Sequence, residues 1–435
     1  MIIKAGYFSD TLKDSDPEVF EAIIGELRRQ SNQIELIASE NFVSQASLEA
    51  LGSVMTNKTV EGYPGHRYYG GAGYADIIET LAIQRACQLF RCKYANVQPH
   101  SGSQANLAVF AALLEPTNTI LSMELTAGGH LSHGSKANVS GKWFNVAHYG
   151  VSEAAGLIDM TEVERLAKEY KPKLLICGGS AYSRTIDFGQ FREIADSVGA
   201  WLLVDMAHFA GLVAGGQYLD PFPHAHVATA TTYKNLRGAR GGLILWNDDD
   251  LSKKINEGVF PGVQGSVMLN AIAAKAVCLG EALKPGFRDY ASSVLANARA
   301  LASTLITRGV DVVSGGTDTP LLLINLMSLQ LTGDAASEAL ERAGLTCNKN
   351  SVPGDTTSVK VTSGLRLGVS AGTARGFSVD EFCCVGNWIA DILLGLAAEG
   401  TCGNISIEKR VRQKTLALCQ SYPIYPSQMD YLSSD

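Results

Sequence analysis

The chain of 435 residues lacks the cysteine spacings of a disulfide framework or a zinc ribbon. Its nine cysteines are odd in number and scattered, and no two form a Cys-x-x-Cys pair. Thiols distributed in this way are typical of a reducing compartment. The sequence therefore predicts an intracellular, cytoplasmic protein.

Long basic runs and long apolar runs are missing as well. The net charge is −7 with no basic tract, which argues against nucleic acid as a partner. No uninterrupted apolar run reaches about 18 residues, and the N-terminus lacks the basic-then-apolar pattern of a signal peptide, so we expect no membrane span. The length and a hydrophobic content of 46% suit two or three domains with a sizeable core.

Short apolar runs that alternate with helical segments favour an α/β fold. Four runs have the length of strands buried on both faces, and residues 191–199, between the first two, have the pattern of a crossover helix. The four runs are 173–177, 200–205, 226–230 and 241–246. This order predicts a largely parallel sheet.

The two ends of the chain have a different pattern. "SDPE" (15–18) is typical of a helix start, and Val19, Ile23 and Leu27 give that helix an apolar face as far as Arg29. A glycine- and aromatic-rich stretch, expected to be a loop, then precedes a predicted helix at 77–90. Later helices and strands are expected at 287–309, 310–315, 320–326, 335–343, 379–397 and 406–419. We predict an N-terminal arm (1–50), a large α/β domain (51–285) and a smaller α+β domain (286–435).

Two charged residues follow predicted strands. Asp205 ends "AWLLVD", and Lys234 comes after "HVATATTY". Ligands of parallel sheets lie at the carboxyl ends of strands, so both residues could face a ligand. Asp205 could equally cap the next turn, and a lone lysine is often a surface residue. If Lys234 is buried, desolvation lowers its pKa and frees the amine for Schiff-base chemistry.

Three further segments could bind a ligand. "PHSGSQAN" (99–106) places hydroxyls and backbone N–H groups before an apolar helix, which suits a phosphate, although such turns also simply cap helices. "AGGHLSHG" (127–134) holds two histidines without further ligands at zinc-like spacing, so we predict no metal; an imidazole laid flat against an aromatic ligand is the alternative. Arg366 in "TSGLRLG" could bind a carboxylate or form a surface salt bridge.

Together these parts match the needs of one cofactor. Pyridoxal phosphate acting on an amino acid needs an amine for a Schiff base, a phosphate cradle and an acid for the ring nitrogen. It also needs a group that binds the substrate carboxylate, for which an arginine is well suited. The residues therefore favour pyridoxal-phosphate chemistry on an amino acid.

Nine motifs, in order along roughly residues 10–420, resemble those of the serine hydroxymethyltransferase family. They are "IELIASENF", "EGYPGHRYYGG", "PHSGSQAN", "GGHLSHG", "SAYSR", "LVDMAHFAGL", "TTYKNLRGARGG", "NKNSVP" and "TSGLRLG". The resemblance implies the pyridoxal-phosphate (PLP) fold type I, which is aspartate-aminotransferase-like. It also implies tetrahydrofolate as co-substrate and a homodimer, or a tetramer of two dimers, with active sites at the subunit interface.

The resemblance implies cofactor roles for the residues at matching positions. Lys234 resembles the Schiff-base lysine and Asp205 the carboxylate that pairs with the pyridine nitrogen, because a protonated ring is a better electron sink. His208 is similar to the partner of the ring oxygen, and His130 to the imidazole stacked on the ring. The other implied cofactor-binding residues are the phosphate cradle Ser101, Gly102 and Ser103, then Ser180, Thr231 and, from the neighbouring subunit, Gly265.

The resemblance also implies a substrate site and a folate site. Ser39 and Arg366 resemble the residues that bind the substrate carboxylate. Glu61 matches the acid beside the transferred hydroxymethyl group, and Tyr69 its neighbouring hydroxyl. The positions that match pterin-binding residues favour a folate acceptor over a folate-free aldolase, and they are Leu125, Gly128, Gly129, Leu131 and Asn350.

The sequence departs from the family pattern near this expected site. Thr59 stands where the family has a tyrosine, and Tyr233 stands where it has a histidine directly before the lysine; we count both among the catalytic residues. Histidine can change charge near neutral pH, whereas tyrosine stays neutral. The other departures are "LGVSAG" after Arg366, Val263 in "PGVQGS", and "SVKVTSG".

These departures bear on the substrate, since the residues expected to carry the chemistry are kept. A threonine in place of a tyrosine leaves space for an extra group on the substrate α-carbon. We therefore expect transfer of the hydroxymethyl carbon of α-methylserine to tetrahydrofolate, giving alanine. The alternatives are the ordinary serine reaction and a folate-independent aldolase or transaldolase. "LTAGGHLSHG" disfavours an aminotransferase, and the presence of Lys234 and Asp205 disfavours an inactive cofactor-binding protein.

Overall fold

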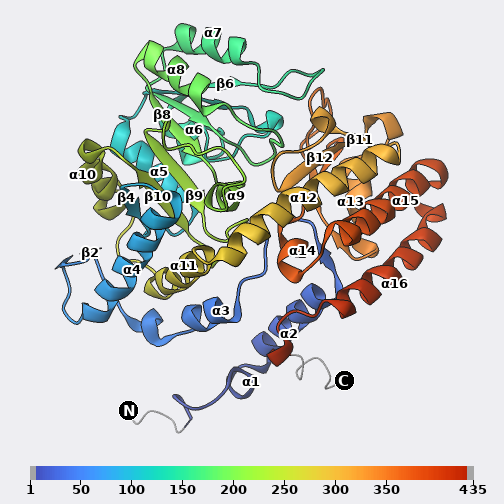
Figure 1. Cartoon of the computed structure of the whole chain (residues 1–435), viewed down its shortest axis with the longest axis horizontal. Helices are drawn as coiled ribbons and strands as arrows, with labels where there is room; N and C mark the ends of the chain where they lie inside the picture. Colours follow the sequence, from blue (N-terminus) through green and yellow to red (C-terminus); the bar gives the residue numbers. More distant parts are fainter. Residues whose placement is uncertain (1–5, 429–435) are drawn as a thin grey trace.

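The structure, a computed structural model, describes residues 6–428, without the side chains of 401–403. A seven-stranded sheet forms its larger part, with the strand order β4-β10-β9-β8-β7-β5-β6 (Figure 1). The strands from β9 to β6 in this order run parallel, whereas β10 is antiparallel to both of its neighbours. Their bounds are β4 Tyr94–Asn96, β5 Thr119–Met123, β6 Asn145–Tyr149, β7 Leu174–Cys177, β8 Trp201–Asp205, β9 Val227–Thr231 and β10 Gly242–Trp246.

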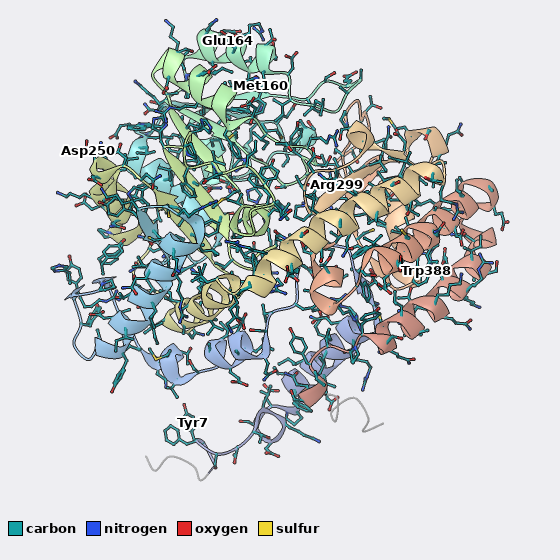
Figure 2. The ribbon with its side chains drawn as sticks, viewed as in Figure 1. Tyr7, Met160, Glu164, Asp250, Arg299 and Trp388 are labelled. Carbon is teal, nitrogen blue, oxygen red and sulfur yellow. The ribbon has the colours of Figure 1, made fainter. Side chains whose placement is uncertain are left out.

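The sheet is buried on both faces because its central strands are apolar without alternation. Every residue of β7, β9 and β10 is buried, with Leu174 and Ile176 in one hydrophobic cluster and Leu175 and Cys177 in the other. Helices α5 (Gly102–Leu113) and α10 (Asp249–Glu257) belong to the first cluster. The helices of the second cluster include α4 (Gly73–Phe90), α7 (Met160–Tyr170), α8 (Phe188–Val198) and α11 (Leu269–Ala282). Helix α7 buries Val163. Its Glu164 points outward, as Figure 2 shows.

A second, antiparallel sheet lies in the C-terminal part of the chain. Its order is β11-β12-β15-β14, with bounds β11 Asp311–Val312, β12 Leu321–Asn325, β15 Gly364–Gly368 and β14 Asn348–Asn350. Helix α12 (Pro285–Thr307) crosses from the large sheet to this one (Figure 1). The remaining larger helices here are α13 Gly333–Arg342, α14 Ser370–Arg375, α15 Val379–Gly403 and α16 Ile405–Ser421.

The N-terminal segment packs onto this C-terminal part. Helix α2 (Pro17–Asn32) lies beside α16, and the short strand β1 (Ile34–Glu35) pairs in parallel with β13 (Leu345–Thr346). The other short elements are the helices and turns α1 Leu12–Ser15, α3 Gln45–Leu51, η1 Val54–Asn57, η2 Leu125–Ala127, α6 Val139–Trp143, α9 Ala210–Ala214, η3 Gly258–Val263, η4 Val313–Gly315 and η5 Met327–Leu329. The domain boundaries at 50 and 285 stay a prediction.

The structure confirms the four central strands and the helices that were predicted, with several corrections. The large sheet is largely parallel, as predicted, with β10 as its antiparallel strand, but strands β4, β5, β6, β14 and β15 were missed. The expected loop before α4 contains a two-strand hairpin, β2 (Gly62–Tyr63) with β3 (His66–Arg67). The apolar face predicted for α2 is only partly buried: Leu27 is buried, but Val19 and Ile23 are exposed.

One described helix is long and apolar enough to cross a membrane by length and composition alone. It lies within Val379–Gly400, and 44% of its apolar window is buried. The search of the sequence for uninterrupted apolar runs did not find this helix because Asp391 interrupts the run. Helix α15 packs against α12, α13 and α16, and the core helix of a folded protein passes the same test, so this is weak support for a span.

Candidate active site

A cavity lies where β8, β9 and the N-terminus of α5 meet. Its wall contains every residue predicted for the cofactor except Gly265, together with Tyr233 and three residues that were not predicted, Asn106, Gly179 and Ala207. The predicted residues in the wall are Ser101, Gly102, Ser103, His130, Ser180, Asp205, His208, Thr231, Tyr233 and Lys234. Residues that are up to 133 positions apart in the sequence are thus brought to one place.

Parallel strands bring the acid and the lysine to the same edge of the sheet. Asp205 is the last residue of β8 and lies opposite Thr229 of β9. Thr231 ends β9, and Lys234 follows three residues later. Gly178, just after β7, is needed at this edge because a Cβ there would lie 2.0 Å from the carbonyl oxygen of Asp205. The edge is therefore the binding edge expected of an open α/β sheet.

The N-terminus of α5 forms a cradle suited to an anion. Ser101 caps the helix, with its Oγ accepting a hydrogen bond from the N–H of Gln104 at 3.2 Å. Gly102 packs against β9 so closely that a Cβ would lie 2.7 Å from Cγ2 of Thr231. The first N–H groups of a helix have no partner within the helix and attract negative charge. The segment therefore caps α5 and also fits a phosphate group, so helix capping and phosphate binding are compatible here.

Asp205 lies at the centre of a buried hydrogen-bond network. Its Oδ2 lies 2.8 Å from Nε2 of His133 and accepts from Nδ2 of Asn106 at 2.9 Å. Its Oδ1 accepts from the N–H of Ala207 at 3.1 Å. Burial alone would raise the pKa of Asp205, but the His133 hydrogen bond and charge, with smaller help from His130 and Asn106, hold it well below the usual value. Asp205 therefore remains a carboxylate beside the cavity.

Sequence reasoning assigned no role to the residues that hold Asp205. In the sequence, His133 was noted only as one of two histidines three positions apart. Within the residues that the structure describes, no group of three or more His, Cys, Asp or Glu side chains could hold a metal ion, so nothing supports the metal alternative for that pair. Asn106 was not singled out because it lies in an otherwise apolar helix. A buried polar residue on such a helix is the signal that could have indicated it.

Lys234 is buried, not the surface residue that a lone lysine often is. Its side chain is 5% exposed, and burial lowers its pKa to about 8 although Asp205 opposes this shift. The amine is thus neutral, and nucleophilic, far more often than an exposed lysine at neutral pH. The carbonyl of Lys234 accepts a hydrogen bond from Nδ2 of Asn41 at 2.9 Å, which fixes the turn after β9.

Tyr233 lines the cavity between two cations. Its ring centroid lies 5.9 Å from Nζ of Lys234 and 4.5 Å from Cζ of Arg240. Burial raises the pKa of its phenol, so the ring stays neutral. Tyr233 therefore shapes the wall next to the amine without adding a charge there.

Two neutral histidines face the same space. Burial lowers the pKa of His130 to about 4 and holds that of His208 far below its usual value. Nδ1 of His208 is buried without a hydrogen-bond partner in the described part of the chain. A buried imidazole nitrogen without a partner needs a ligand atom, and the hydroxyl oxygen on the pyridine ring of pyridoxal phosphate is a suitable one. The cavity therefore fits this cofactor at its phosphate end and at its ring.

Arg366 approaches the cavity from the smaller sheet. Its Nη1 donates to the carbonyl of Ser180 at 2.8 Å, and its Nε to Oδ1 of Asn348 at 3.1 Å. Burial lowers the pKa of Arg366 to about 10, and no carboxylate pairs with it among the residues described. The surface salt bridge considered from the sequence is thus absent there. Ser39 lies near the end of the same strand, since its neighbour Ala38 packs on Gly368.

The predicted folate residues lie around the cavity but not in its wall. The carbonyl of Gly128 accepts from the N–H groups of Ser180, at 2.7 Å, and Ala181. Gly129 is tightly packed, since a Cβ there would lie 2.2 Å from the carbonyl oxygen of Met123. Leu125 and Leu131 are exposed, and Asn350 lies in β14 opposite Gly364.

Four predicted residues are absent from the wall of the cavity. Thr59 and Tyr69 are exposed, and a Cβ on Gly265 would lie 3.5 Å from Oε1 of Glu61. The N–H of Val60 donates to Oγ of Ser266 at 3.2 Å, which holds the two segments together. None of the four lines the cavity. Their part in the site of a second subunit stays a prediction.

The fold and the cavity define a pyridoxal-phosphate enzyme of fold type I. The chain belongs to the serine hydroxymethyltransferase family, whose model matches residues 12–389.

Three relatives named serine hydroxymethyltransferase illustrate the similarity. The protein from Paramagnetospirillum magneticum is 60% identical over 96% of this chain and 98% of its own length. Those from Paracoccus denitrificans and Novosphingobium aromaticivorans are 58% and 59% identical, covering 97% and 98% of this chain and 98% of their own. The predicted family, fold, enzyme class, cofactor and folate co-substrate are thus confirmed.

Proposed function

We propose that this enzyme transfers the hydroxymethyl carbon of serine to tetrahydrofolate and releases glycine. The observation that supports serine most directly is the similarity of nearly the whole chain to relatives named for that substrate. These names favour serine over the α-methylserine that we expected from the sequence. The intact set of buried groups around Lys234 supports an active enzyme of this class.

The cofactor residues have a distinct task each. Bound pyridoxal phosphate supplies an electron sink for the substrate α-carbon. Lys234 would provide the amine that holds the cofactor, and Asp205 would keep a proton on the ring nitrogen. His208 would donate from Nδ1 to the hydroxyl oxygen on the ring, and His130 would cover the ring face. Ser101, Gly102 and Ser103 would hold the phosphate, and Ser180 and Thr231 line the same cavity.

The amino-acid and folate groups complete this assignment. Arg366 and Ser39 bind the substrate carboxylate, since Arg366 is half-buried and its hydrogen bonds within the described chain go to neutral groups. The pterin lies against Leu125, Gly128, Gly129, Leu131 and Asn350. Two of these positions are exposed leucines, which offer apolar surface for a flat heterocycle.

A second subunit supplies the rest of the site in this proposal. Thr59, Glu61, Tyr69 and Gly265 lie outside the cavity of their own chain, so a homodimer would let them reach the cavity of the other one. We also propose that the enzyme is cytoplasmic. Its domains are proposed to meet at residues 50 and 285.

α-Methylserine is the second candidate substrate, and Tyr233 favours it. This tyrosine lines the cavity beside Lys234, at a position where the family resemblance expects a histidine. Thr59, next to Glu61 in the chain, replaces a larger tyrosine. Both changes alter the space and polarity around the α-carbon and leave the cofactor groups intact.

A substrate comparison tests the proposal. We expect the purified enzyme with tetrahydrofolate to release glycine from L-serine faster than alanine from either enantiomer of α-methylserine. Faster release of alanine would show that α-methylserine, and not serine, is the preferred substrate. In that case Thr59→Tyr should suppress α-methylserine turnover more than serine turnover, whereas Thr56→Tyr, on the same exposed segment, should change neither.

A further inference from the structure

A fully buried lysine holds the backbone that leads into the phosphate cradle. Lys275, in the middle of α11, is 1% exposed. Its Nζ donates to the carbonyl oxygens of Val97 at 2.7 Å, Pro99 at 2.8 Å and Gly242 at 3.1 Å. An ammonium has three donors, so this one is completely satisfied by backbone. A buried lysine with three carbonyl partners is far from the usual exposed position of lysine.

Gln264 holds the same backbone turn from another side. Its Nε2 donates to the carbonyl of Gln98 at 3.1 Å, and its Oε1 accepts from the N–H of His100 at 2.9 Å. Three successive carbonyls, those of Val97, Gln98 and Pro99, are therefore fixed by the side chains of Lys275 and Gln264.

This turn passes directly into the cradle. Residues 97–100 end at Ser101, the cap of α5, whose first turn contains Gly102 and Ser103. Gly242 completes the link: its N–H donates to the carbonyl of Pro99 at 2.9 Å, and a Cβ on it would lie 2.4 Å from the carbonyl oxygen of Ser101.

The lysine side chain packs closely against Gly241. A Cβ on Gly241 would lie 2.0 Å from Cε of Lys275, so this glycine makes room for the lysine. Loss of the ammonium would remove one donor from each of three buried carbonyls, of which that of Pro99 keeps the N–H of Gly242, and the turn would shift to find new partners. A shift of the turn moves the N–H groups that face the anion.

We propose that Lys275, together with Gln264, positions the phosphate-binding turn of the cofactor site. Lys275 itself does not line the cavity, so it acts through the backbone and is a positioning residue. The inference depends on cofactor binding at this cavity and is independent of which amino acid is the substrate.

The test compares two ligands that differ only in the phosphate. The affinities of apoenzyme for pyridoxal 5′-phosphate and for pyridoxal are measured by absorbance titration, for the parent protein and for Lys275→Met, which keeps the chain length without the donors. We expect the ratio of the two affinities to fall at least about tenfold in Lys275→Met, with pyridoxal affinity changed little; tenfold corresponds to about 1.4 kcal/mol. Lys254→Met, an exposed lysine on α10, should leave the ratio unchanged.

Other outcomes separate the possible failures. An equal loss of affinity for both ligands, or no loss at all, would overturn the positioning role. If Lys275→Met does not fold, Gln264→Met is measured in its place, and an unchanged ratio there would overturn the proposal as well. If the parent protein binds neither ligand, the assignment of the cofactor to this cavity is wrong, which is a different result.

Discussion

Replacing Lys234 with alanine is expected to lower turnover by about 10³-fold or more and to remove the visible absorption band of the lysine-bound cofactor. Among the residues that the structure describes, Lys234 is the only lysine in the cavity wall, and its pKa of about 8 makes its amine available near neutral pH. Alanine removes the nucleophile and leaves the cradle and Asp205 in place. Steady-state kinetics and an absorbance spectrum of the purified variant measure both effects.

A surface lysine provides the control for Lys234→Ala. Lys254 is exposed on α10, so Lys254→Ala should behave as the parent protein does in both measurements. If Lys234→Ala kept the absorption band and more than a tenth of the turnover, another amine would hold the cofactor, and the assignment of Lys234 would be wrong.

Replacing Asp205 with asparagine is expected to lower kcat by about 10²- to 10³-fold while the cofactor still binds. Asparagine has almost the same size and keeps an oxygen that can accept a hydrogen bond. It loses the charge that stabilises a proton on the ring nitrogen, and the pairing of His133 with a carboxylate is lost with it. The loss should therefore appear in kcat far more than in cofactor affinity.

Asp196→Asn is the matched control for Asp205→Asn. Asp196 is exposed on α8 and pairs with Arg192, so its charge lies outside the cavity. The contrary result would be a large loss of cofactor affinity in Asp205→Asn together with normal turnover by the molecules that still carry the cofactor. It would mean that Asp205 maintains the structure of the site and does not stabilise a proton on the ring nitrogen.

The residues at strand ends could be predicted from the sequence because one rule places them. Asp205 and Lys234 follow apolar runs, and the carboxyl edge of a sheet is where ligands bind. Whether Lys234 is buried could not be predicted, since burial depends on the packing of α5 and the smaller sheet around the edge. The alternatives for Arg366 were also open, because β15 was not recognised as a strand.

The partners of Asp205 could not be predicted because they come from distant parts of the chain. Asn106 belongs to α5 and His133 to the loop after β5, and nothing in either local pattern points to residue 205. Lys275 was hidden for the same reason. Within the apolar helix "LNAIAAKAVCLGEA" it looks like a solvent-facing charge, and only the fold shows three carbonyls around it.

Missed strands were the main gap in the predicted fold. Apolar runs identify buried strands but carry no information on their direction, so the prediction of a largely parallel sheet could not single out β10, which runs antiparallel to β9 and β4. Strand β4 has three residues and β6 alternates polar with apolar residues, so neither has the continuous apolar run on which the prediction depended.

The most direct measurement is a mass balance on the enzyme loaded with pyridoxal phosphate and supplied with L-serine, with and without tetrahydrofolate. A folate-dependent hydroxymethyltransferase should form glycine and a one-carbon folate in equal amounts, and much less glycine when folate is left out. Glycine released at the same rate without folate would contradict a transferase and indicate a folate-independent aldolase in its place.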